Sequence, residues 1–353
     1  EGDTGTGVGW YSVNWPAAIT ALGDVFPELA TNEEARTVFS AIVAITSSGT
    51  KVRDNFNNAV EIYAQVRNGK KLSKVQVGNQ RSEQMEEKLG QLEELIDQHG
   101  FAKLRSHLLQ TTTVQDINAR LRAAGQKTNN DYLKETIVPY SAIYFGPKLG
   151  MFYANLMGGD NYLTMDLWWS RSMNRMRGLL EPEPTESAIT RFRELVGNDA
   201  PKNKYQLFDL ADEYRNNYKN RVAPWRKGGY ITSLEEALGR KEGATTKDKK
   251  SFERLAQKKL GARPRILDEL KRQHRAEKTA NTIAKEAFDR LEEAPFNATD
   301  RKFMIDIANQ AQANLAKRGI DLTISDIQAA LWYYEKRLYG RLRGGGEQDI
   351  GYD

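Results

Sequence analysis

The sequence predicts an all-α protein. Apolar side chains recur every three or four residues along most of the chain, as they do along one face of an α-helix. Several of these segments begin with residues that cap helices, and none has the alternation of apolar and polar residues that marks a strand. The chain has 353 residues, of which 39% are hydrophobic and 28% charged. It is therefore long and apolar enough to fold around one large core or two smaller ones.

The N-terminal part predicts a short segment followed by two helices. Residues 1–30 contain a Gly-rich start and three aromatic side chains, Trp10, Tyr11 and Trp15. Residues Thr31–Glu34 have the spacing of a capping box and predict the start of an apolar helix. This helix is expected to end at Ser47–Gly49. A second helix is expected over residues 53–68, where apolar residues again recur at helical spacing.

The middle of the chain predicts further amphipathic helices. Apolar residues at helical spacing occur over 85–96 and 104–109, and a capping box at Thr113–Asp116 begins the next helix. Residues 132–144 also have a helical pattern. Pro139 is expected to kink or restart that helix, because proline lacks the amide donor that a helix interior needs.

The C-terminal half contains more helices and one expected loop. Residues 182–184, Pro-Glu-Pro, interrupt the pattern before helices near 185–197 and 203–221. Residues 240–250 have no apolar anchor and are expected to form an exposed loop. We divide the chain into an N-terminal segment (1–30), a main domain (31–230), a helical C-terminal region (231–343) and a flexible tail (344–353).

The last helix of the C-terminal region has both a start signal and an apolar face. Thr323–Asp326 has the spacing of a cap. Its predicted apolar stripe consists of four residues at helical spacing: Ile327, Leu331, Tyr334 and Leu338.

Composition excludes several classes of site. The chain has no cysteine, which rules out disulfides, thiolate metal sites and iron–sulfur clusters. Its three histidines are expected at helix ends and on surfaces, so we predict no metal and no cofactor. No apolar run approaches the roughly 18 residues that span a bilayer, and the first residues lack a signal peptide. We expect no membrane and a cytoplasmic location in a bacterium or phage-infected cell, with a virion as the alternative.

The charge of the chain favours an anionic partner. The net charge is +5, and polyanion binding gains from the release of counterions. The 47 acidic residues show that charge is mixed along the chain, so this inference is general and names no site.

The most informative segment is Tyr144–Gly150, which predicts a helix entering a tight turn and a second helix leaving it. Such a turn directs free backbone N–H groups at one spot, which suits a phosphate. Lys148 opens the second helix on the same edge. After a Gly-Gly turn, Asp166 begins a further helix, on which Arg171 and Arg175 share a face because they are four residues apart.

This pattern resembles the helix-hairpin-helix DNA glycosylase superfamily, especially its endonuclease III type. The hairpin lysine and the aspartate are 18 residues apart (166 − 148). Arg171, Asn174 and Arg175 follow the aspartate at the spacing of that type. The resemblance covers about residues 136–180 and extends faintly back to residue 35. Residues 324–339 resemble segments of phage-encoded relatives of this fold.

The resemblance implies a glycosylase-like core with additional C-terminal helices, and double-stranded DNA as the partner. It implies that Asp166 is the essential carboxylate and Lys148 the nucleophile of bifunctional members. It also implies DNA contacts from a set of further residues: Gly146, Pro147, Gly150, Arg171, Arg175 and, in an early helix-turn-helix over 39–59, Thr50.

The chemistry of base excision suits these two residue types. The enzyme must extrude the target nucleotide, at a cost of roughly a few kcal/mol. Departure of the base leaves positive charge on the sugar, which an ionised Asp166 would stabilise. A neutral Lys148 would attack the sugar carbon and form a Schiff base that permits strand cleavage.

The chain departs from the family pattern at three places. Tyr144 replaces the first hairpin glycine, Pro147 removes one backbone donor, and Leu167–Trp168 replace the usual Thr-His. These departures leave the target base open.

Each of these residues also has a structural interpretation. Lys148 can be a solvated first-turn lysine, Asp166 a plain N-cap, and the two arginines partners of acidic neighbours. Trp168 and Trp169 are expected to be core rather than base-stacking residues, with at least one of them buried.

Three functions therefore stay open. The first is a DNA glycosylase with abasic-site lyase activity. The second is a non-catalytic DNA-binding protein with the same fold, of phage virion or polyprotein origin. The third is an enzyme that modifies hypermodified pyrimidines in phage DNA.

Overall fold

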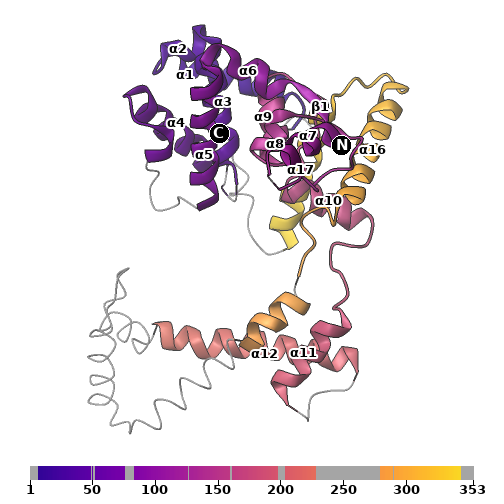
Figure 1. The fold of residues 1–353 in the computed structure, drawn as a ribbon. Helices are drawn as coiled ribbons and strands as arrows, with labels where there is room; N and C mark the ends of the chain where they lie inside the picture. The colour runs from indigo at the N-terminus through magenta and orange to yellow at the C-terminus, as the bar shows by residue number, and fades with distance from the viewer. Residues whose placement is uncertain are drawn as a thin grey trace, which may run out of the picture. The chain divides into compact units, whose positions relative to one another are not determined.

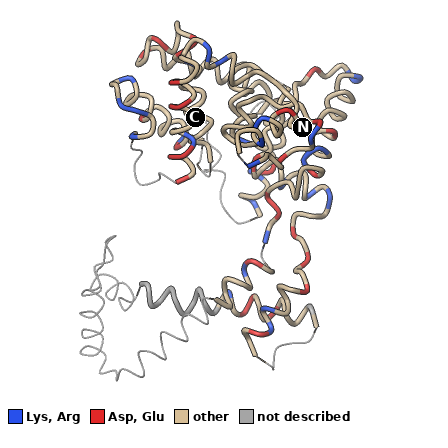
Figure 2. Tube along the Cα trace, in the orientation of Figure 1, with Lys and Arg blue, Asp and Glu red and all other residues tan. Residues whose placement is uncertain are grey.

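The protein is mostly helical, which confirms the all-α prediction (Figure 1). The computed structural model describes these residues: 7–48, 50, 52–75, 83–125, 127–159, 161–197, 203–227, 279–288 and 290–342. Basic and acidic residues are interspersed along them (Figure 2). Contacts divide the chain into two units: unit 1 is Glu1–Leu180 with Glu292–Asp353, and unit 2 is Glu181–Leu291. The predicted boundary near residue 230, the loop at 240–250 and the tail from 344 lie outside the described residues and stay predictions.

Helices near the N-terminus form the first core of unit 1. They are the π-helix η2 (Trp10–Asn14), α1 (Trp15–Leu22), α2 (Pro27–Thr31), α3 (Glu33–Thr46), α4 (Val52–Arg67), the 3-10 helix η3 (Leu72–Lys74), α5 (Glu83–His99) and α6 (Phe101–Leu109). Helix α3 lies at the centre, because every residue from Thr37 to Thr46 is buried. Tyr11, Trp15 and Leu29 pack in the same core, so the N-terminal segment is part of it.

The start of α3 differs from the prediction by one residue. Thr31 is the last residue of α2, and its hydroxyl donates to the Pro27 carbonyl at 3.2 Å. Asn32 is the cap instead, and its Oδ1 accepts from the Glu34 N–H at 2.7 Å and the Ala35 N–H at 3.2 Å. The predicted caps at Thr113 and Thr323 are confirmed.

A second small core in unit 1 surrounds a two-stranded sheet. Strands β1 (Thr111–Thr113) and β2 (Ile137–Pro139) pair antiparallel, with Thr112 opposite Val138. They lie beside α7 (Val114–Ala123), α8 (Tyr140–Tyr144) and α9 (Leu149–Leu156). The expected helix over 132–139 is therefore wrong, and the helix begins only after Pro139. The reason is that β1 provides partners for an extended backbone, which a single-chain pattern does not show.

The third core of unit 1 joins distant parts of the chain. It packs α10 (Leu167–Met176) against α16 (Ala298–Ala316) and α17 (Ile324–Leu342). The N-terminal segment also reaches α17, since the Gly9 N–H donates to Asp326 Oδ1 at 2.7 Å. A Cβ atom on Gly7 would lie only 2.8 Å from the Ala330 backbone, so the two segments touch backbone to backbone.

Unit 2 is a separate helical body. Helices α11 (Glu186–Val196) and α12 (Lys204–Lys227) and the helical residues 279–288 belong to it. Its core includes Phe192, Leu207 and Ile283. Thr185 caps α11 by accepting from the Ala188 N–H at 3.2 Å.

Candidate functional site

The predicted hairpin lies between α8 and α9. Gly146 has φ of +92°, a conformation that side chains other than glycine rarely adopt. The Pro147 carbonyl accepts from the Tyr132 hydroxyl at 3.2 Å, and the Tyr144 carbonyl accepts from Lys88 Nζ at 3.0 Å. Side chains from two other parts of unit 1 thus hold the turn, and Lys148 stands at its end as the N-cap residue of α9.

Gly150 allows α8 and α9 to approach closely. A Cβ atom there would lie 2.2 Å from backbone atoms of Ser141 and Ala142. The Ser141 hydroxyl donates to the Gly150 carbonyl at 2.8 Å, which joins the two helices again. Gly150 is buried, so the structure gives this predicted DNA-contact residue a packing role within the hairpin.

Asp166 is half-buried at the start of α10. Its backbone is extended, and its Oδ1 accepts from the Trp169 N–H at 2.8 Å, as an N-cap does. Burial raises the pKa of Asp166 to about 6, while the positive charge of Lys148, the Trp169 N–H and the nearby Trp332 side chain of α17 oppose that rise.

The charges of Lys148 and Asp166 each shift the pKa of the other group. Burial lowers the pKa of Lys148, and the negative charge of Asp166 works against that lowering. The structure therefore brings together the two residues that the sequence singled out, although α9 and a loop separate them along the chain. Each charge partly offsets the cost of burying the other.

A buried polar cluster adjoins Asp166. The Tyr11 hydroxyl donates to Gln328 Oε1 at 3.2 Å, and the side chains of Thr164 and Asn155, which hydrogen-bond to each other, lie close enough to lower its pKa. Burial raises the pKa of Tyr11 well above its usual range, and the charge of Asp166 adds to this effect. The sequence analysis missed this cluster. Residues 11 and 328 are 317 positions apart, and no local pattern links them.

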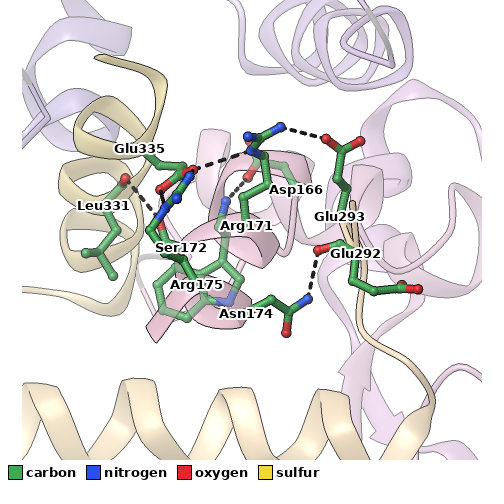
Figure 3. Close-up of polar contacts among 10 residues, drawn as sticks. Asp166, Arg171, Ser172, Asn174, Arg175, Glu292, Glu293, Leu331 and Glu335 are labelled. Carbon is green, nitrogen blue, oxygen red and sulfur yellow. Dashed lines mark hydrogen bonds and ion pairs between the residues drawn. The ribbon is translucent and has the colours of Figure 1, made fainter. Parts of the chain in front are cut away.

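Arg171 and Arg175 form ion pairs within unit 1 (Figure 3). Arg171 is 3% exposed, and it pairs with Glu293 at 2.7 Å and with Glu335 at 3.4 Å. Arg175 pairs with the same Glu335, through Nη2 at 2.6 Å and Nε at 3.0 Å. The predicted contact with acidic neighbours is present, and the DNA contact of these arginines stays a prediction.

Aromatic rings and a further hydrogen bond complete this network. The Arg171 guanidinium carbon lies 3.9 Å from the centroid of the Tyr339 ring and 5.5 Å from that of Trp168. Asn174 Nδ2 donates to the Glu292 carbonyl at 2.8 Å (Figure 3). All three residues that follow the aspartate at the family spacing therefore hold other segments of the protein against α10.

The remaining predicted residues have local roles. The Thr50 hydroxyl donates to the Thr46 and Ser48 carbonyls and so closes the turn between α3 and α4. Trp169 is fully buried, which confirms that at least one of the paired tryptophans belongs to the core. Trp168 is half-buried and meets Trp332 and Tyr339 edge to face.

His107 differs from the surface role expected of the histidines. It is half-buried, stacks on His99 with 3.8 Å between ring centroids, and shares a hydrogen bond with the Tyr144 hydroxyl at 3.1 Å. Burial and the neighbouring His99 lower the pKa of His107. His274 lies outside the described residues.

In the part of the chain that the structure describes, His, Asp and Glu side chains form no group of three that could hold a metal ion. No helix among these residues combines the length and apolar character needed to cross a membrane.

Comparison with known protein families, with curated proteins and with solved structures finds no match to this chain.

Proposed function

We propose that the chain is a DNA glycosylase with abasic-site lyase activity, in which Asp166 and Lys148 do the chemistry. One observation carries the proposal: these two side chains share a half-buried place where each charge alters the pKa of the other. Perturbed pKa values of paired, partly desolvated groups are typical of catalytic sites, although structural ion pairs also show them.

Asp166 suits the role of a stabilising carboxylate. With a pKa of about 6, it is roughly nine-tenths ionised at pH 7. Its Oδ1 accepts from the Trp169 N–H at 2.8 Å, and the nearby Trp332 side chain favours the ionised carboxylate. A carboxylate fixed in this way would face the positive charge that develops on the sugar as the base departs.

Lys148 suits the role of a nucleophile. Its lowered pKa increases the fraction of neutral amine near pH 7. The Nζ lone pair would form a bond to the sugar C1′ while the bond from C1′ to the base breaks, and the base would leave with that electron pair. Loss of the Nζ proton and opening of the sugar ring would then give the Schiff base from which the strand is cleaved.

A non-catalytic DNA-binding protein is the second candidate. The observation that favours it is that Asp166 caps α10 while Arg171 and Arg175 pair within the protein. Each of these contacts stabilises the fold without any catalytic role.

Borohydride trapping separates the two candidates. The full chain is incubated with duplexes that contain an abasic site or a panel of damaged and modified bases, and the Schiff base is reduced. We expect a covalent adduct that is lost in Lys148→Ala and retained in Lys302→Ala, which changes an exposed lysine of α16. Asp166→Asn should abolish base release.

Each other result has a definite meaning. Base release without an adduct would contradict the role of Lys148 and leave that of Asp166. Salt-sensitive DNA binding with neither reaction would support the second candidate. The absence of DNA binding at low salt would contradict both.

A further inference from the structure

We infer that Tyr11 is a positioning residue of the candidate site, which closes one side of the place that Lys148 and Asp166 share and holds α17 there. This inference rests on the proposed function, because it assigns a role to a further residue at the same site. Tyr11 is 7% exposed and belongs to the N-terminal segment, which the sequence analysis separated from the main domain. Its role joins the start of the chain to the proposed chemistry.

The first argument is that Tyr11 is fixed on α17. Its hydroxyl donates to Gln328 Oε1 at 3.2 Å, and both side chains are buried. Two glycines bring the segment onto the helix. Gly7 lies so close to the α17 backbone that a Cβ atom would meet it at 2.8 Å, and the Gly9 N–H donates to Asp326 Oδ1 at 2.7 Å. The segment therefore lies along α17, and Tyr11 has a defined position on it.

The second argument is that Tyr11 also reaches α9 and the loop before α10. Its ring meets the Phe152 ring of α9 edge to face, with 6.0 Å between the centroids. Asn155 of α9 and Thr164 of the loop, whose side chains hydrogen-bond to each other at 3.3 Å, lie close to the Tyr11 hydroxyl. The Thr164 carbonyl in turn accepts from the Asp166 N–H at 3.0 Å. Tyr11 is thus in contact with the three segments that build the site.

The third argument is that Tyr11 brings bulk without charge. Burial raises the pKa of Tyr11 well above its usual range, and the charge of Asp166 adds to that rise, so the hydroxyl stays neutral. The other ionisable groups that act here are Lys148 of α9 and the buried Tyr333 of α17. Tyr334 is instead 64% exposed, which corrects its expected place in the apolar stripe of that helix. The Tyr11 ring therefore excludes water near the carboxylate and adds no charge to the pair.

Removal of the ring should hydrate the site. Tyr11→Ala would leave a space lined by the polar side chains that now surround the hydroxyl, and a polar space of that kind takes up water. Asn155 Oδ1 is buried without a hydrogen-bond partner among the described residues and would bond to such a water. Because burial is the largest cause of the raised pKa of Asp166 and of the lowered pKa of Lys148, water should return both toward their ordinary values.

The test is the titration of Asp166 in the full chain, followed by NMR of aspartate labelled with carbon-13 at Cγ. Asp166→Asn identifies the resonance. The two variants are Tyr11→Ala and Tyr11→Phe, the second of which keeps the ring and removes only the hydroxyl. The matched control is Tyr63→Ala. Tyr63 is 6% exposed, packs in the same core and has its hydroxyl 3.4 Å from Glu28, but it belongs to α4.

We expect the Asp166 midpoint to fall from about 6 by roughly one unit, toward 3.8, in Tyr11→Ala. It should stay close to 6 in Tyr11→Phe and in Tyr63→Ala, although the control also loses a buried ring. Borohydride trapping of Lys148 at pH 7 should slow in Tyr11→Ala by about tenfold for each unit that its pKa rises, because the neutral fraction falls by that factor. If Tyr11→Ala does not fold, Gly7→Ala pushes the segment off the α17 backbone and should lower the midpoint in the same direction.

The outcomes distinguish this inference from the proposed function. A midpoint that stays near 6 in Tyr11→Ala and Gly7→Ala, with an adduct formed by the unchanged protein, overturns the role of Tyr11 and leaves the proposed chemistry in place. A lowered midpoint without adduct or base release by the unchanged protein supports the position of Tyr11 and contradicts the enzyme. Equal falls in Tyr11→Ala and Tyr63→Ala overturn the inference, because a general loosening of the core would explain both. An equal fall in Tyr11→Phe also overturns it, because the ring would then not be the group that excludes water.

Discussion

Glu335→Gln tests whether the buried ion pairs hold α17 against α10. Glu335 is 1% exposed and accepts hydrogen bonds from both Arg171 and Arg175. Glutamine keeps the volume of the side chain but removes its charge. The buried guanidinium of Arg171 then loses a charged partner that water cannot easily replace.

The expected loss follows from the exposure of each partner. Removing one member of a buried ion pair costs about 3–5 kcal/mol. Arg171 keeps its 2.7 Å pair with Glu293, and Arg175 is 34% exposed and can be rehydrated, which favours the lower end of that range. We therefore expect a loss of about 3 kcal/mol in the free energy of unfolding. For a body of 150–250 residues this corresponds to a fall of about 6–12 °C in Tm.

Urea and thermal unfolding followed by indole fluorescence would measure this loss. Five of the six tryptophans, Trp10, Trp15, Trp168, Trp169 and Trp332, belong to unit 1, so the signal reports mainly on the unit that contains the network. The control is Asp306→Asn, which removes one partner of the exposed pair Lys302–Asp306. Exposed pairs contribute only about 0–1 kcal/mol. A loss below 1 kcal/mol in Glu335→Gln, or a loss equal to that of the control, would refute the reasoning.

Three further predictions concern the hairpin and Asp166. Gly150→Ala should lower the free energy of unfolding by about 2 kcal/mol or more, because the added Cβ would collide with the backbone of α8. The control Gly90→Ala in α5 has open space around the added Cβ and should raise the free energy of unfolding by up to about 1 kcal/mol. Equal effects of the two substitutions in urea unfolding would contradict this prediction. Base release needs ionised Asp166, whose pKa is raised to about 6, so its rate should increase as pH rises through 6 and be about tenfold lower at pH 5 than at the plateau. A flat rate between pH 5 and pH 8 would count against that role. Trp332→Phe removes an indole N–H that favours the ionised carboxylate, so it should move the midpoint of this profile to higher pH. An unmoved midpoint would show that the indole does not act on Asp166.

Local signals account for the parts of the fold that the sequence predicts well. The caps at Thr113 and Thr323 are correct because a capping box involves only residues within one turn of each other. The helix expected over 132–139 fails because strand β2 depends on pairing with β1, about 25 residues earlier in the chain. The cap of α3 moves to Asn32 for a related reason, since a separate short helix ends at Thr31.

The candidate site divides in the same way. Lys148 and Asp166 were predicted from a spacing within one segment, and the structure brings them together. Tyr11 and Trp332 were missed because they reach Asp166 from the two ends of the chain. Glu335 was missed as the partner of the arginines because it is 160 residues from Arg175. Contacts at that separation leave no periodic trace in a sequence.

Because Arg171 and Arg175 form ion pairs within the protein, their match to the family spacing is weak evidence for a glycosylase. Arg171, Asn174 and Arg175 match the family spacing, but each has a structural role that would preserve it without catalysis. The same holds for the cap formed by Asp166. Lys148 is different, because burial disfavours its charge and a fully solvated lysine would serve equally well to begin a helix. Burying Lys148 costs stability whether or not its amine reacts, and Asp166 offsets only part of that cost, so the trapping of Lys148 carries more weight than any of the spacing matches.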